Sequence, residues 1–186
     1  MTWLIVLVVL LVLVALAGVV VYNRLVRLRN RTENSWAQID VQLRRRHDLI
    51  PNLVEAVKGY AAHERGVFDE VTQARAAVLG AEGPRAAAEA NDMLGAALGR
   101  LFAVAEAYPE LRASENFLRL QDELTDTEDK IAAARRYYNA TVLRFNTRQQ
   151  TFPTLIVART FRFKPREFFE AGEDADQPVA VSVASE

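Results

Sequence analysis

An uncharged apolar segment near the start of the chain constrains its fold more than any other feature. The segment runs from Trp3 to Tyr22 and holds twenty residues without a charged side chain. As a helix rising about 1.5 Å per residue it would be about 30 Å long, which matches the hydrocarbon thickness of a bilayer. Aromatic side chains, which favour the membrane interface, stand at both of its ends. The segment is therefore predicted to be a transmembrane helix.

A cleaved signal peptide is the alternative interpretation of this segment, because Ala15-Leu16-Ala17 has the small residues of a cleavage site. No basic residue precedes the apolar run, however, and the run continues past these alanines, which favours an uncleaved anchor. Arginines follow the segment and none precedes it, so the positive-inside rule predicts a single-pass protein of the cell membrane. Its N-terminus would lie outside and its helical domain in the cytoplasm. The flanking residues, which could also hold anionic lipid headgroups, are Arg24, Arg27, Arg29 and Arg31.

The rest of the chain has the apolar periodicity of long helices. Apolar residues recur at steps of three, four or seven from Trp36 to Ala61, and Pro51 within this stretch predicts a kink without a break. Further helical stripes cover Val67 to Val78 and Leu94 to Tyr108. A helix of about 54 Å is predicted for residues 115–150, with an apolar seam from Phe117 to Phe152. The predicted fold class is all-α: one transmembrane helix followed by an antiparallel up-and-down bundle of about four long helices.

The pattern changes after Pro153, and the end of the chain is acidic. Phe161 and Phe163 alternate with basic residues, which predicts an extended strap over the bundle and no fifth long helix. Residues 171–186 are acidic and rich in small residues, a composition typical of disordered tails. The predicted domains are an anchor at 1–22, a helical bundle at 23–170 and a disordered tail at 171–186.

The composition removes the commonest catalytic and metal-binding chemistries. The chain has no cysteine and two histidines, His47 and His63. Neither histidine follows a glutamate at the spacing of a di-iron bundle, and His63-Glu64 lacks the second histidine of a zinc-protease motif. No nucleophile elbow or phosphate-binding glycine loop occurs, and a formal net charge of -1 disfavours nucleic acid as a partner. We therefore expect no cofactor, no metal and no enzymatic activity.

Two rows of polar residues follow the predicted helices. The first repeats every four residues, which allows opposite charges to pair; its members are Asp40, Arg44, Asp48 and Asn52. The second flanks the seam of the long helix; its members are Glu128, Arg135, Asn139 and Asn146. If the rows face each other, Arg44 would meet Glu128, and Arg135 would meet Asp40 or Asp48, which would fix the register of the helices. The alternative is solvent-exposed rows, with the asparagines favouring partial burial of the second.

The stretch from Arg44 to His47, within the first row, combines three arginines and a histidine. His47 lies four residues after Leu43 and three before Ile50, so it is expected to pack on the apolar face. Arg45 and Arg46 are expected on the surface, where they could contact a partner or a lipid.

Four blocks of sequence carry a family resemblance: YNRLVRLRN (22–30), SWAQIDVQLRRRHDLIPNLVEAVKGYAAHE (35–64), EDKIAAARRYYNATVLRFN (128–146) and FPTLIVARTFRFKPREFFE (152–170). They resemble the LemA family of bacterial membrane-anchored helical proteins. The resemblance covers roughly residues 2–170. It implies one N-terminal span and an antiparallel helical bundle, and it supplies no established biochemical activity and no catalytic residues.

These observations favour a non-enzymatic, membrane-tethered interaction or scaffold protein. Its expected partners are membrane lipids, an unidentified membrane or cytoplasmic protein, or further copies of itself in a homo-oligomer. An uncharacterised hydrolase or metal-dependent enzyme is the alternative from another class, with a site near His47, Asp48, His63 and Glu64. A third hypothesis is an accessory factor of a membrane complex that organises lipid or the envelope through Arg24, Arg27 and Arg31.

Overall fold

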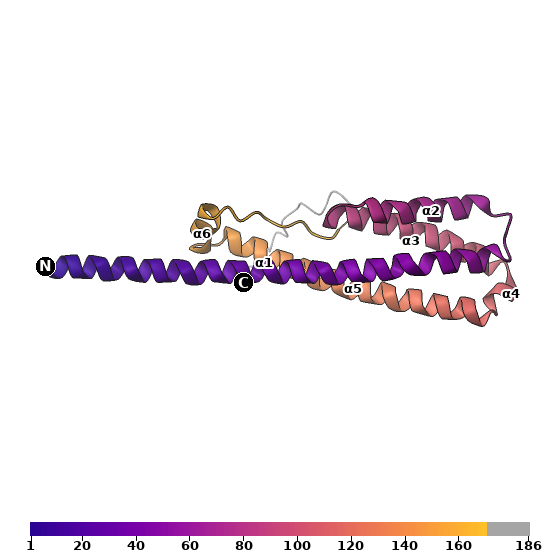
Figure 1. Cartoon of the computed structure of the whole chain (residues 1–186), viewed down its shortest axis with the longest axis horizontal. Helices are drawn as coiled ribbons and strands as arrows, with labels where there is room; N and C mark the ends of the chain where they lie inside the picture. The colour runs from indigo at the N-terminus through magenta and orange to yellow at the C-terminus, as the bar shows by residue number, and fades with distance from the viewer. Residues whose placement is uncertain (171–186) are drawn as a thin grey trace, which may run out of the picture. The chain divides into compact units, whose positions relative to one another are not determined.

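The structure is a computed structural model, and it describes residues 1–170. Within these residues it has no strand and six helices (Figure 1): α1 (Thr2–Lys58), α2 (Arg65–Gly80), α3 (Pro84–Glu106), α4 (Pro109–Arg112), α5 (Glu115–Gln150) and α6 (Thr154–Thr160). The all-helical class is thus confirmed. The count of about four bundle helices stays a prediction, and the periodicity did not indicate the short helices α4 and α6. The bundle arrangement stays a prediction, and the acidic tail predicted at 171–186 lies outside the described residues.

Helix α1 joins the predicted membrane span to the packed part of the chain without a break. Its N-terminal part is long and apolar enough to cross a membrane, and none of that part is buried against other described residues. The helix also continues through Pro51, as the unbroken phase of the apolar positions predicted. An anchor that spans the bilayer would therefore share one continuous backbone with the first packed turns.

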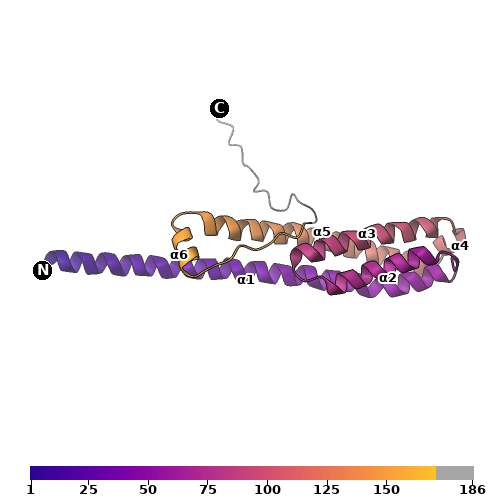
Figure 2. The ribbon, with the colours of Figure 1, turned by 90° about the horizontal axis from the view of Figure 1, so that it is seen from above.

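The described chain divides into two compact units, of which the first comprises residues 1–46 and 123–167. In this unit α1 and α5 run antiparallel, because later positions of α1 meet earlier positions of α5. The Ser35 and Thr141 hydroxyls lie 2.9 Å apart, and Arg46 Nε lies 2.6 Å from Glu128 Oε1. Figure 2 shows α6 beside α1, next to the end of α5. Leu25, Phe145 and Ala158 form a buried cluster that joins the three helices.

The segment after α5 differs from the expected strap in its first half. Residues after Pro153 first form α6, and only residues 163–168 are extended without regular secondary structure. The Phe163 amide donates to the Ala158 carbonyl at 2.9 Å, which ends the helix, and Arg162 between them has a left-handed φ of 54°. Phe152 was expected in the apolar seam, but this was wrong. Its side chain is 76% exposed, because it follows the end of α5 at the turn into α6.

Among the described residues, the second unit comprises 47–122 and 168–170. Its helices α2 and α3 form a hairpin around the predicted turn, where Gly83 adopts a φ of 88° that favours glycine. Arg100 Nε and Glu70 Oε2 pair across the hairpin at 2.7 Å. Apart from His47, the buried side chains described in this unit are apolar, and they include Val57, Val71, Leu94, Leu101 and Leu111.

Candidate functional site

The arginines that follow the apolar span fall into two groups in the structure. Arg24 and Arg27 are exposed, and neither side chain forms an ion pair or hydrogen bond with another residue of 1–170. Arg31 donates a hydrogen bond from Nε to the hydroxyl of Tyr137 at 2.9 Å. Arg29 is partly buried; its guanidinium stands 5.8 Å from the ring centre of Phe163. Two of the four predicted flanking residues are thus engaged within the first unit, and two face solvent.

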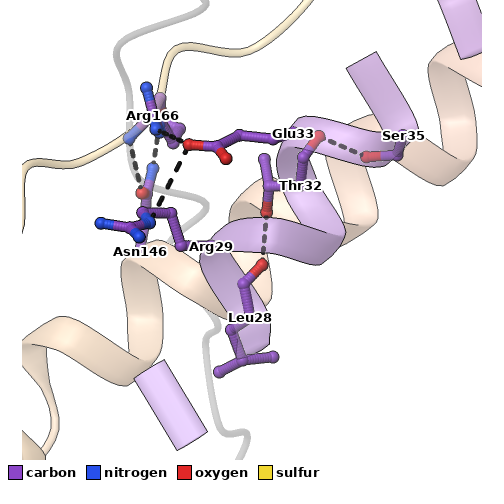
Figure 3. A network of polar contacts seen from close by, with 7 residues as sticks. All are labelled: Leu28, Arg29, Thr32, Glu33, Ser35, Asn146 and Arg166. Atoms are coloured by element: carbon purple, nitrogen blue, oxygen red, sulfur yellow. Dashed lines mark hydrogen bonds and ion pairs between the residues drawn. The ribbon is translucent and has the colours of Figure 1, made fainter. Parts of the chain in front are cut away.

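A polar network ties the extended strap to both long helices of the first unit (Figure 3). Arg166 of the strap pairs with Glu33 of α1, and Arg29 lies 3.9 Å from the same carboxylate. Asn146 of α5 donates to the backbone carbonyl of Arg166 at 2.8 Å and accepts from its amide at 2.9 Å. The side-chain amide thereby replaces the strand partner that an extended segment would otherwise need.

Tyr138, eight residues before Asn146 on α5, also holds the strap. Its ring is buried and lies 5.6 Å from that of Trp36, and its hydroxyl donates to the Glu167 carbonyl at 2.8 Å. Burial raises the pKa of Tyr138 to about 12, so the phenol stays protonated and remains a donor at every physiological pH. With Asn146, this side chain fixes both the position and the direction of the strap.

The two predicted polar rows do not meet as the paired hypothesis required. Arg44 is exposed and pairs with Asp40 on its own helix at 2.8 Å. Asp48, Asn52 and Arg135 are exposed, whereas Glu128, Asn139 and Asn146 are partly buried. The residue that meets Glu128 is Arg46. Arg46 was expected on the surface, but this was wrong, since only 3% of it is exposed. The step from Arg44 to Arg46 turns a helix by about 200°, which places the two side chains on opposite faces.

The Arg46–Glu128 pair joins α1 to α5, and its two side chains are buried to different extents. The Arg46 side chain is 4% exposed and the Glu128 side chain 40%. Burial raises the pKa of Glu128 above its ordinary value, although the Arg46 guanidinium acts in the opposite direction. Arginine stays protonated in proteins, so its guanidinium needs an anion or hydrogen-bond acceptors when it is buried. The second arginine of the triplet, Arg45, is half-exposed and lies 3.9 Å from Asp126.

The four residues of the enzyme hypothesis differ in exposure. His47 is buried on the apolar face, as predicted, whereas Asp48, His63 and Glu64 are exposed. Burial lowers the pKa of His47, and the nearby Arg75 guanidinium lowers it further, so the imidazole is neutral near pH 7. Among the described residues no group of three histidine or acidic side chains has the arrangement of a metal site.

The sequence of the chain has relatives among known proteins. A sequence model of the LemA family matches residues 35–183, which is most of the chain. The chain belongs to the LemA family. It is 28% identical over 184 residues to magnetosome protein MamQ 2 of Paramagnetospirillum magneticum, covering 85% of this chain and 68% of that protein. It is 28% identical over 152 residues to protein LemA of Metamycoplasma hominis, covering 81% of this chain and 69% of that protein.

The first unit of this LemA-family chain also has buried polar residues that the sequence reasoning missed. The Thr32 hydroxyl donates to the Leu28 carbonyl, and the Ser35 hydroxyl donates to the Thr32 carbonyl and meets Thr141 of α5. All three side chains are at most 4% exposed. Their positions were visible in the sequence, because Leu25, Thr32, Ser35 and Ile39 are separated by seven, three and four residues. The Ser35–Thr141 contact was not predicted, because only apolar residues were assigned to the core.

Proposed function

We propose that this LemA-family protein is a non-enzymatic interaction module anchored in the cell membrane, with its helical bundle in the cytoplasm. The observation that carries the proposal is the continuity of α1, which leads from the apolar span into the packed chain within one helix. A domain held in this way has a restricted orientation relative to the bilayer and can present a constant surface to a partner. A membrane or cytoplasmic protein, a second copy of the chain and membrane lipids are the proposed partners; nucleic acid is not.

The use of polar side chains in the first unit supports a binding role over catalysis. Its buried and partly buried polar groups hold helices and strap together: Arg46 with Glu128, Ser35 with Thr141, and Asn146 with the strap. Exposed apolar side chains remain on the outside of both units, where a partner protein could cover them. They include Val41, Leu79, Met93, Leu118 and Leu143.

Site-specific photo-cross-linking in native membranes tests the interaction role. A photoreactive residue is placed at Val41 or Met93, which are 60% and 59% exposed, and the matched control position is the buried Leu94. We expect a discrete protein adduct, from a partner or a second copy, at one exposed position and none at Leu94. Adducts with lipid alone, or a smear independent of position, would argue against the module. Stoichiometric metal in the purified full chain, together with turnover of a substrate, would favour the alternative of an enzyme.

The proposed orientation has a separate test, which the lack of native cysteines makes simple. Single cysteines are introduced at Thr2, before the apolar span, and at Glu110, an exposed residue of α4. With a membrane-impermeant maleimide we expect labelling of Thr2→Cys in intact cells, and of Glu110→Cys only after permeabilisation, because basic residues follow the span. The reverse pattern would invert the orientation without affecting the proposed interaction role.

A further inference from the structure

A hollow of about 280 Å³ lies in the first unit where α1 leaves the apolar span. Four basic side chains line it and no acidic one does; they are Arg29, Arg162, Lys164 and Arg166. Its size is near the lower end of the range of about 300–1,000 Å³ that small-molecule pockets occupy. The hollow therefore suits one compact anionic group.

The four cations divide into an internally paired set and an available set. Arg166 and Arg29 are both directed at Glu33, whose single carboxylate lies between them. Arg162 and Lys164 are exposed and have no side-chain ion pair or hydrogen bond within residues 1–170. Arg162 and Lys164 therefore give the hollow an excess of positive charge. A phosphate group accepts hydrogen bonds well from both guanidinium and ammonium donors.

The backbone at Arg162 adds an independent observation. Its amide donates to the Arg159 carbonyl at 3.2 Å, and the next amide reaches back to Ala158, so Arg162 occupies the left-handed position of a Schellman helix end. Glycine is the usual residue there, because a side chain at φ 54° is strained. The chain therefore carries an arginine at a position where its backbone geometry favours glycine, and this places the guanidinium in the lining of the hollow.

The aromatic side of the hollow places it at the level of lipid headgroups. Tyr22, the last residue of the apolar span, lies 4.7 Å from the ring of Phe161 and 5.8 Å from that of Phe163. Tyrosines at the end of a span favour the headgroup layer. Phe152, Ile156 and Phe161 around α6 are 76%, 58% and 58% exposed, and Phe161 is continuous with the span through Tyr22. A membrane surface could cover these apolar side chains together.

We infer that this hollow binds the phosphate of an anionic phospholipid headgroup, with Arg162 and Lys164 as its main ligands. Phe152, Ile156 and Phe161 contact the outer part of the acyl layer beside the bound lipid. The arrangement makes α6 and the turn after it a second membrane contact next to the anchor. This inference rests on the membrane anchorage in the proposed function and is independent of any protein partner.

Lipid retention by the full chain tests the assignment. The protein is reconstituted with equal amounts of phosphatidylcholine and phosphatidylglycerol, and bound lipids are counted by native mass spectrometry. The test variants are Arg162→Gln/Lys164→Gln and Arg162→Gly, which removes the charge and relieves the left-handed backbone. The charge-matched control is Arg135→Gln/Arg136→Gln, two exposed residues about 15 Å along α5 from Phe145.

Attraction of a basic side chain to an anionic surface corresponds to about a five-fold preference. We therefore expect wild type and control to retain phosphatidylglycerol about ten-fold or more over phosphatidylcholine, Arg162→Gly to retain it several-fold less, and the double variant to approach parity. Equal retention by the double variant and wild type would overturn the inference. An equal loss in the control would also overturn it, because general charge would then explain the preference.

Two further arms identify the source of a failure. Displacement of phosphatidylglycerol by millimolar inorganic phosphate would mean that the hollow binds free phosphate, and the lipid assignment would be wrong. Resistance to phosphate together with the expected variant pattern supports the lipid. Flotation with phosphatidylcholine vesicles is measured first. A wild-type chain that does not float would contradict the proposed membrane anchorage. A chain that floats but shows no lipid preference would contradict only the headgroup site.

Discussion

Replacing Phe145 with alanine should lower the free energy of unfolding by about 3–5 kcal/mol. Phe145 is fully buried and packs with Leu25 and Ala158, so its ring joins α5 to α1 and α6. Truncation removes the transfer free energy of the ring and leaves a cavity at the meeting point of three helices. The ring also lies 6.4 Å from Phe163, so its loss should loosen the start of the strap.

The effect of Phe145→Ala can be measured by urea unfolding of the full chain in detergent. Trp36 lies against Tyr138 within the first unit, so its fluorescence reports on that unit. Leu143→Ala is the matched control, since this side chain is on the same helix and 50% exposed, and its expected change is within about 0.5 kcal/mol. Phe145→Leu should fall between the two if the alanine variant fails to fold. Equal unfolding midpoints for Phe145→Leu and wild type would contradict the buried position.

The second large effect is expected at the Arg46–Glu128 pair, and the two partners should differ. Glu128→Ala should cost about 2–3 kcal/mol, because it removes a carboxylate 2.6 Å from a buried guanidinium that cannot lose its proton. The figure is below the value of about 3–5 kcal/mol for a fully buried pair, since Glu128 is 40% exposed. Arg46→Met should cost about 1 kcal/mol or less, because Met preserves the packing and Glu128, which is 40% exposed, keeps part of its hydration.

The pH dependence of this pair follows from the raised pKa of Glu128. The folded state holds the proton more tightly than the unfolded chain, whose carboxyl titrates near its ordinary value of 4.5. The stability that Glu128 gains from binding this proton is therefore fully present below about pH 4.5, and it is lost as the pH rises through the folded-state pKa. Arg46→Met should steepen this loss, since the guanidinium no longer opposes the effect of burial, and Glu128→Ala should abolish it. Urea unfolding of wild type, Arg46→Met and Glu128→Ala between pH 4 and pH 8, at about one measurement per pH unit, checks both statements. A larger loss of stability in Arg46→Met than in Glu128→Ala would refute the expected difference between the two partners.

The local elements of this chain could be predicted because their signals are local. The long helix was expected at residues 115–150 and is observed at Glu115–Gln150; a serine precedes it, and Pro153 follows it closely. The turn at residues 80–84 was equally clear from its glycines and proline. In each case a few neighbouring residues decide the backbone, through propensity and through the hydrogen bonds available to them.

The contacts between helices could not be predicted in the same way. Helical periodicity gives the residues that share a face, but it does not say which position of a second helix faces them. Arg46 shows this, since it continues the steps of Ile39, Leu43 and Ile50, yet its charge suggested the surface. A guanidinium can occupy a core position only where another helix supplies a carboxylate, and Glu128 is 82 residues away in the chain. Pairings at that separation depend on the register of the packed helices.

The sequence by itself determined the membrane anchor candidate, the all-α class, the long helices and the LemA family, because each depends on residues close together or on a matched pattern. Tertiary structure alone decided which arginines pair, where the strap is attached, and how Arg29, Arg162, Lys164 and Arg166 gather beside Tyr22. The physical reason is that these charges come from α1 and from a turn more than 130 residues later in the chain. Only the packing of α6 against α1 near Leu25 brings these four side chains to one hollow.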